Sequence, residues 1–161
     1  MIKQLKVSLA NQPGTLLGVV SALAEAGVDL KALQVNDRGV SGDVRMIVSD
    51  LEKAKRTLGT AGHEFEVIEA VVAEMDDRVG GLASILSLLQ AEQINVEALY
   101  AFVTRVQGKS LAVLTVSDQA RAERVLSEHG VNTLAHQSEL TDPAAPRTPS
   151  LGDHLGVDFF W

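Results

Sequence analysis

The chain has 161 residues, of which 46% are hydrophobic and 22% are charged, and its net charge at pH 7 is −7. The densest basic cluster is KAKR at 53–56, so the acidic balance argues against binding driven by neutralisation of nucleic-acid phosphates. Cysteine is absent, which excludes disulfides, thiolate metal sites and cysteine nucleophiles.

The N-terminal sequence resembles no signal peptide, and no apolar run approaches the roughly 18 residues of a membrane-spanning helix. We therefore expect a cytoplasmic protein with no membrane partner. The length suits one ordinary domain or two small ones.

The first elements are a strand and a helix. Residues 3–10 alternate apolar and polar side chains, with Leu5 and Val7 on the same face, which predicts a half-buried strand. Residues 14–27 carry apolar side chains at helical spacing, and Gly27 suits the end of that helix.

A hairpin, a second helix and a fourth strand follow. Two apolar runs, at 28–36 and 43–49, flank the turn sequence NDRGVSGD. Asp50 is a suitable N-cap for a helix through about residue 61. The sequence EFEVIEA at 64–70 predicts the last strand.

The chain then repeats this pattern. Adding 66 to positions 11–33 gives 77–99, and from position 48 onward the offset is 68. Two additional residues must lie between 100 and 110, where a turn is expected. The identical pairs are Gly14 and Gly80, Leu16 and Leu82, Ser21 and Ser87, Leu23 and Leu89, Ala32 and Ala98, Leu33 and Leu99, and later Val48 and Val116, Ser49 and Ser117, and Asp50 and Asp118.

The order β-α-β-β-α-β is the split βαβ of the ferredoxin-like plan. We predict an α+β protein of two ferredoxin-like units, 1–70 and 71–140, each an antiparallel sheet with both helices on one face. No linker separates them, since FEVIEAVVAEM runs from one into the other. The two sheets are therefore expected to pair side by side.

A tail at 141–161 holds three of the four prolines and predicts an extended connector. It ends in HLGVDFFW, so half of the six aromatic residues are the last three. This cluster suits a docking peptide for a partner or another subunit, or packing on its own domain.

The junction NQPGTLLG at 11–18 delivers the first strand to a helix N-terminus, where free backbone N–H groups and the helix dipole favour a carboxylate. Pro13 fixes φ at the helix entry, and Gly14 lets ligand atoms approach closely. Asn11 offers a donor and an acceptor, which suits an amino acid. The alternative is that the segment is only a turn before a helix.

The junction pattern [DN]-x-P-G-x-L and the strand order resemble the ACT domain. NQPGTLLGVVSALAEAGVDLKAL matches this pattern, and DDRVGGLASILSLLQAEQINVEAL matches it except at Val79, where proline is usual. The resemblance covers about residues 3–140 and leaves the tail outside.

The resemblance implies a sensor for an amino acid or a similar small carboxylate, held between paired domains by the loop of one domain and the second strand of its neighbour. It implicates Asn11, Gln12, Pro13, Gly14, Thr15, Leu16, Asp29 and Leu30 in the first unit, and Asp77, Gly80, Gly81, Leu82, Asn95 and Val96 in the second. Without the proline and with Gly81, the second loop is expected to be more flexible, so the first site is the better candidate.

Exposed sheet edges and faces favour pairing, so we expect a homodimer. The resemblance implies a protein that regulates a metabolic enzyme, with no catalysis and no cofactor. A regulatory subunit of a biosynthetic enzyme such as acetolactate synthase is an alternative, although this chain repeats its first unit where that subunit has a different domain. A small ferredoxin-like enzyme is less favoured, because the four histidines lack metal-ligand spacing and there is no nucleophile elbow or P-loop. RNA recognition lacks the aromatic residues it needs in the third strands.

Overall fold

The computed structural model of the chain describes residues 1–37, 39–103, 109–136 and 138–141. The aromatic tail therefore lies outside the described residues. In chain order the elements are β1 (Ile2–Ala10), α1 (Thr15–Glu25), β2 (Leu30–Asp37), β3 (Ser41–Val48), α2 (Leu51–Thr60), β4 (Phe65–Asp76), α3 (Gly81–Ala91), β5 (Val96–Val103), β6 (Lys109–Val116), α4 (Gln119–Glu128) and α5 (Ser138–Thr141). This order confirms the α+β fold of two ferredoxin-like units.

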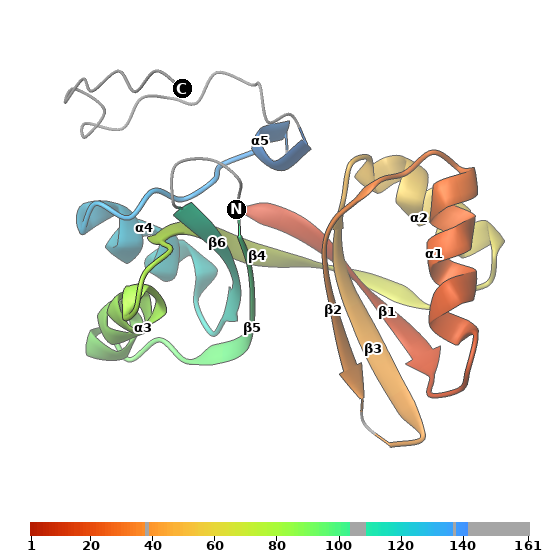
Figure 1. Cartoon of the computed structure of the whole chain (residues 1–161), viewed down its shortest axis with the longest axis horizontal. Coiled ribbons are helices and arrows are strands. Elements are labelled where there is room, and N and C mark those ends of the chain that lie inside the picture. The colour runs from red at the N-terminus through yellow and green to blue at the C-terminus, as the bar shows by residue number, and fades with distance from the viewer. Residues whose placement is uncertain (38, 104–108, 137, 142–161) are drawn as a thin grey trace.

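The strands form one antiparallel sheet in the order β2-β3-β1-β4-β6-β5. Strand β4 belongs to both halves, because it pairs with β1 as far as Ala70 and with β6 from Val71 onward. The sheet is strongly curled, with α1 and α2 on one outer side and α3 and α4 on the other (Figure 1). The expected last strand of the first unit and first strand of the second are thus one element.

The elements reproduce the sequence repeat. Helix α3 begins 66 residues after α1, whereas β6 and α4 begin 68 residues after β3 and α2. The offset changes between the end of β5 and the start of β6, which is the predicted interval.

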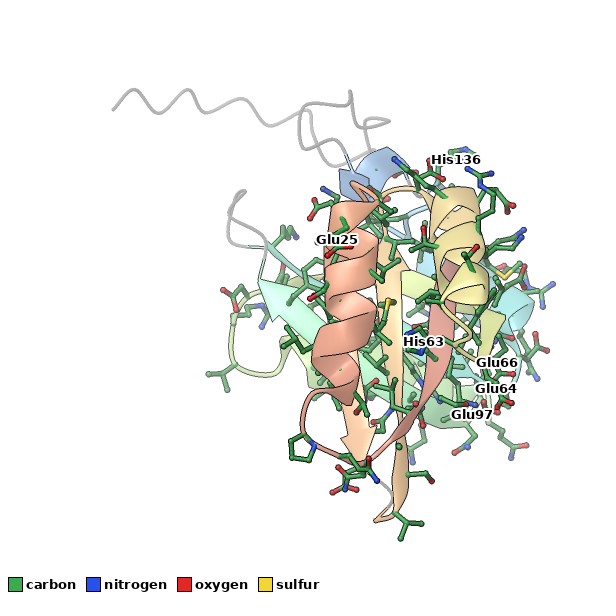
Figure 2. The ribbon with its side chains drawn as sticks, turned by 90° about the vertical axis from the view of Figure 1, so that its right-hand side faces the viewer. Glu25, His63, Glu64, Glu66, Glu97 and His136 are labelled. Atoms are coloured by element: carbon green, nitrogen blue, oxygen red, sulfur yellow. The ribbon has the colours of Figure 1, made fainter. Side chains whose placement is uncertain are left out.

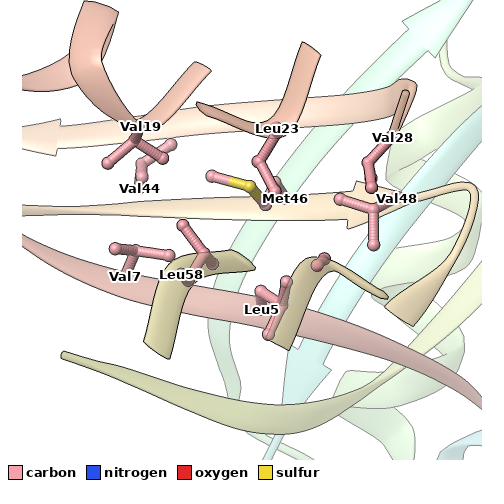
Figure 3. Close-up of a cluster of buried hydrophobic side chains, with 10 residues drawn as sticks. Leu5, Val7, Val19, Leu23, Val28, Val44, Met46, Val48 and Leu58 are labelled. Carbon is pink, nitrogen blue, oxygen red and sulfur yellow. The ribbon is translucent and has the colours of Figure 1, made fainter. Parts of the chain in front are cut away.

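Each unit has a core between its helices and one face of its strands. In the first unit, α1 contributes Val19 and Leu23 and α2 contributes Leu58, all fully buried. They lie over the inward-facing side chains of β1 and β3 (Figure 3). In the second unit, Ile85 and Leu89 of α3 and their neighbours form the equivalent cluster.

The strand faces that point away from the helices pack against each other. Their shared cluster joins side chains of both units: Ile2, Ala32, Ile47, Ala70, Val72, Leu111, Val113 and Leu134. Burial of this apolar area, at about 25 cal/mol per Å², stabilises the curled arrangement.

One polar group bridges this apolar interface. The side chain of Gln4 is 0% exposed; its Nε2 donates to Thr115 Oγ1 at 3.0 Å, and the Tyr100 hydroxyl donates to its Oε1 at 3.0 Å. Arg45 Nη1 also donates to Thr115 Oγ1, at 3.2 Å. The Tyr100 hydroxyl is protonated at neutral pH, and burial raises its pKa further. A buried amide satisfied at both ends fixes how the two halves meet.

The last strand of the second unit is reduced to one bridge between Ala73 and Thr133. After it, the backbone N–H groups of Ala135 and His136 donate to Glu139 Oε1 at 3.1 and 2.8 Å. These donors are therefore satisfied by the short helix α5, which the sequence reading missed, and not by a continuing strand.

The second helix of each unit begins at an aspartate, as predicted for Asp50. Asp50 and Asp118 accept hydrogen bonds from the N–H groups of Lys53 and Arg121, both at 2.9 Å. The first helix of each unit has no such cap. Among the described residues, no helix is long and apolar enough to cross a membrane.

The repeat makes a prediction about backbone strain. Gly27 follows α1 with φ of 68°, and its equivalent after α3 is Gln93 with φ of 54°. A side chain in this left-handed region costs about 1–2 kcal/mol, offset in part by the greater freedom of glycine in the unfolded chain. We expect Gln93→Gly to raise the free energy of unfolding by about 0.5–1 kcal/mol.

The reciprocal change, Gly27→Gln, should lower the free energy of unfolding by a similar amount. A Cβ at position 27 would meet only Lys53 Nζ, at 3.6 Å, so the loss comes from the backbone and not from a clash. Urea denaturation of both variants measures the difference. Equal stabilities for Gln93→Gly and the parent chain would contradict the strain at this position.

Candidate functional site

The loop between β1 and α1 ends at an uncapped helix N-terminus. Gly14 is the N-cap residue, with φ of 92° and no side-chain hydrogen bond to the first turn. A Cβ built there meets nothing within 4 Å, so the space above the loop is open. The Thr15 hydroxyl is turned back onto the carbonyl of Ala10, at 2.8 Å. The first helical turn thus presents backbone donors without an acidic side chain, which suits a carboxylate.

Asn11 holds this loop against the β2–β3 hairpin. Its Nδ2 donates to Asp37 Oδ1 at 3.0 Å and to the carbonyl of Gly39 at 2.7 Å. Its backbone N–H donates to the carbonyl of Val40 at 3.2 Å. Both amide hydrogens of the side chain are therefore used within the protein. The group that Asn11 offers to a ligand is its Oδ1, an acceptor suited to an ammonium group.

Asp29 lies just before β2 and carries an exposed carboxylate. Lys31 Nζ lies 2.6 Å from its Oδ2. The hydrogen bond and charge of Lys31 hold the pKa of Asp29 below its ordinary value. Ser49 fixes the backbone here, because its Oγ accepts from the N–H of Asp29 and its own N–H donates to the carbonyl of Asp29, both at 2.9 Å.

The two parts of the first predicted site lie at opposite ends of the unit. Asn11 is bonded beside Val40, which precedes β3, whereas the backbone of Asp29 is bonded to Ser49, which follows β3. The eight residues of β3 lie between these two points, a separation on the order of 25 Å at about 3.3 Å per residue. No small ligand reaches both from within one unit, so a shared site needs a second unit alongside.

The second unit builds the same junction with other contacts. Gly80 is the uncapped N-cap residue of α3, with φ of 89°. Asp76, at the end of β4, accepts from Lys109 Nζ at 2.6 Å and from Arg78 Nε at 3.1 Å. These hydrogen bonds hold the pKa of Asp76 below its ordinary value.

Gly81 is explained by packing. It is buried in the first turn of α3, and a Cβ there would lie 2.2 Å from the carbonyl oxygen of Asp76. Thr15, the equivalent residue of the first unit, reaches the equivalent carbonyl with its hydroxyl instead. The close approach of the Asp76 carbonyl therefore accounts for glycine at position 81. The sequence alone relates this glycine to loop flexibility instead.

The remaining predicted residues take positions equivalent to those in the first unit. Asn95 is bound to Ser117 through the same pair of backbone contacts, at 2.9 and 3.1 Å. Leu30 and Val96 begin their strands and pack partly into the two cores. Asp77 is exposed in its loop. Within the described ranges, no group of three or more His, Cys, Asp or Glu residues is placed to hold a metal ion.

Sequence reasoning missed the residues that hold the predicted ones in place. Lys31 neutralises Asp29, and Asp37 and Gly39 bind Asn11. The pairing of Lys31 with Asp29 could have been predicted from the sequence, because side chains two residues apart on a strand lie on the same face. The Asn11 contacts carry no such signal, since they cross from one loop to another through the fold.

Comparison with known proteins adds three findings. The family model described as "ACT domain pair" matches residues 1–142. The crystal structure of protein BT0572 from Bacteroides thetaiotaomicron is similar over 86% of this chain and 94% of that chain, with 31% sequence identity and a TM-score of 0.81. A search of curated protein sequences gives no match.

More distant structures share the fold. The ligand-free regulatory subunit of aspartate kinase from Thermus thermophilus has 16% identity and a TM-score of 0.56, covering 78% of this chain and 91% of that chain. A structure of aspartokinase alpha and beta subunits has 18% identity and a TM-score of 0.53, covering 80% and 96%.

The Asp29–Lys31 pair gives a prediction for pH dependence. A depressed pKa means that folding favours the ionised carboxylate, so this contribution is present above the unfolded-state pKa and is lost as pH falls through the folded-state value. We expect the pKa of the Asp29 carboxyl to lie below its ordinary value in an NMR pH series. Lys31→Met should move its midpoint upward, because the hydrogen bond and charge that lower the pKa of Asp29 are removed.

The matched control is Lys55→Met, which removes the partner of Glu52 instead. It should leave the Asp29 midpoint unchanged. An Asp29 midpoint that does not respond to Lys31→Met would show that the pair does not form in solution.

Proposed function

Because the chain belongs to the ACT-domain family, we propose that it is a non-catalytic regulatory protein of the cytoplasm that binds an amino acid or a similar small carboxylate. The observation that supports this most directly is the pair of uncapped helix N-termini, at Gly14 and Gly80. They lie at equivalent places in the repeat, and the first N–H of each helix, from Thr15 or Gly81, already donates to the carbonyl of Gln12 or Arg78. The N–H groups that follow in the first turn would receive the carboxylate. Ligand binding would modulate a partner enzyme or the assembly of the protein itself.

The proposed first site combines the loop of one chain with the start of β2 in a second copy. The backbone N–H groups of the first turn of α1, around Leu16, would receive the ligand carboxylate. Asn11 Oδ1 and the Asp29 carboxylate of the other copy would receive its ammonium group. Lys31 already neutralises Asp29 in the free protein, so the ligand ammonium would share or replace this partner.

An exposed strand edge supports the homodimer. Strand β2 is at the end of the sheet order and so has one unpaired side. Val35 on this strand is 53% exposed, Leu33 is 39% exposed, and Leu17 of α1 is 68% exposed. Unpaired edges with apolar side chains favour pairing with another chain.

The side chains of β2 also suggest a register for this pairing. An antiparallel pair of β2 strands centred on Gln34 sets Leu33 opposite Val35 of the second copy. It also sets Lys31 opposite Asp37, a favourable pair of opposite charges. The same register brings Asp29 opposite Gly39 of the second copy, and Gly39 is the residue that Asn11 binds. The two separated parts of the site would then meet at each end of the interface.

The first site remains the better candidate of the two. In the second loop, Val79 stands where the first has Pro13 in the family pattern, and its side chain is 100% exposed. It makes no packing contribution that would hold the loop. The edge of the second unit is also less apolar, since Ala83 and Ala101 are the equivalents of Leu17 and Val35.

The alternative function is that of a dedicated regulatory subunit of a biosynthetic enzyme. The resemblance in fold to regulatory subunits of aspartate kinase supports this kind of role. At 16–18% identity these structures show the fold alone, so the partner enzyme and the ligand of this chain are left to experiment.

A thermal-shift screen of the twenty amino acids and of aromatic acids tests the ligand proposal. A ligand at 100 times its Kd should stabilise the protein by about 2.7 kcal/mol and raise its Tm. Asn11→Ala and Asp29→Ala should reduce the shift strongly. The matched variants Asp77→Ala and Asn95→Ala should reduce it less. No response to any compound would remove the main support for a sensor, and a response that none of the four variants weakens would place the site elsewhere.

Light scattering tests the dimer. Val35→Lys adds like charges across the proposed edge and should convert a dimer into a monomer of about half the mass. Ala101→Lys makes the same change on β5 and should leave the mass unaltered. A monomeric parent chain, or a dimer indifferent to Val35→Lys, would rule out pairing through β2.

A further inference from the structure

A groove lies on the outer face of the first unit, between the helices of the pair. Its volume is about 500 Å³, within the range of roughly 300–1,000 Å³ typical of ligand pockets. Small and polar side chains line it: Ala22, Glu25 and Ala26 of α1 and its end, and Arg56, Thr57, Thr60 and Ala61 of α2 and its end. Figure 2 shows α1 and α2 side by side on this face, with Glu25 near the upper end of α1.

The equivalent helix pair of the second unit carries larger side chains at two of these positions. In the second unit, Leu88 and buried Val125 occupy the places of Ala22 and Thr57. There the two helices are also joined by an ion pair, with Arg121 Nη2 2.5 Å from Glu92 Oε2. The helix pair that forms the groove thus has small side chains where its counterpart has larger ones.

The charge beside the groove has a counterpart elsewhere in the chain. Of the KAKR segment at 53–56 on α2, Arg56 lines the groove, together with Glu25 of α1, whereas Lys55 pairs with Glu52. The tail segment 153–161, DHLGVDFFW, combines Asp153 and Asp158 with three aromatic residues. Aromatic side chains contribute large buried areas in pockets, and opposite charges at the rim direct and orient docking.

The last described element before the tail lies toward the same end of the molecule as the groove. Figures 1 and 2 both place α5, the last described element, toward the same end as the upper end of α1. The eleven residues 142–152 separate α5 from the acidic and aromatic segment. Extended, they span up to about 36 Å, which is comparable to the diameter of a small domain.

We propose that residues 153–161 dock in the groove between α1 and α2 of the same chain, with aromatic side chains over Ala22 and Ala26 and the acidic side chains toward Arg56. The groove lies at the C-terminal end of α1, where Asp29 precedes β2 and belongs to the proposed ligand site, whereas the Asn11–Leu16 loop lies at the N-terminal end of α1.

The only tryptophan of the chain, Trp161, reports directly on this contact. In the full chain its emission should be blue-shifted, and its quenching by acrylamide weaker, relative to a synthetic peptide of residues 142–161. Arg56→Glu should remove most of this protection, and the loss should resemble the effect of high salt.

The groove itself is tested by transferring the side chains of the second unit. The double variant Ala22→Leu, Thr57→Val fills the groove with residues that the equivalent helix pair already accommodates. It should expose Trp161 to the level of the free peptide while the circular dichroism spectrum stays that of the parent. Leu88→Ala, which opens the second helix pair instead, should leave Trp161 protected.

Three results would overturn the proposal. Emission and quenching of the parent chain identical to those of the peptide would show that the tail is not docked. Protection that persists in the filled variant would place the tail elsewhere. Protection that is lost on dilution, together with a fall in mass by light scattering, would show that a second copy supplies the contact.

Discussion

Strand β4 is the constraint on which the rest of the molecule depends. Its first half pairs with β1 along one edge, and its second half pairs with β6 along the other. Since hydrogen bonds along a strand fix the register of its neighbours, one continuous strand fixes the position of both units at once. The curl of the sheet then brings together the faces that the helices leave uncovered, and their apolar side chains form a third core.

The two units share one fold, but the packing of their inner faces requires different residues in each. On the shared inner face, the first unit supplies Gln4 and Arg45, and the second supplies Tyr100 and Thr115. Because a buried polar group is costly when it lacks a partner, these residues are useful only as a set. The outer faces differ as well, since Leu88 and Val125 of the second helix pair are larger than Ala22 and Thr57 of the first. The two units thus differ at both surfaces: their inner faces carry complementary residues, and their outer helix pairs carry side chains of different size.

The geometry of the loops bears on regulation. The helix N-terminus and the start of β2 are at opposite ends of each unit, so a ligand that contacts both must join two units. Such a ligand stabilises whichever arrangement of units brings the two parts together, and this differential affinity is what shifts a population of states. Asn11 strengthens the link, because it couples the loop that would receive the ligand to the β2–β3 hairpin of the same unit.

Local sequence determined much of this protein. The period of apolar residues, the aspartate caps at Asp50 and Asp118, and the offset that changes from 66 to 68 were enough to predict the elements, their order and the fold class. Each of these features involves residues close together in sequence or a repeat of the sequence, so it can be identified without the tertiary structure. The loop residues of the candidate site were predicted from the junction sequence together with the resemblance to the ACT domain.

Tertiary structure alone decided how the units meet. Neither the merging of two strands into β4 nor the replacement of the final strand by α5 follows from local preference, because each depends on which donors find partners across the fold. The same holds for Gly81, which is glycine because a carbonyl from β4 passes close to it. It holds again for Asn11, whose amide hydrogens serve the β2–β3 hairpin, because contacts between residues far apart in sequence exist only once the chain has folded.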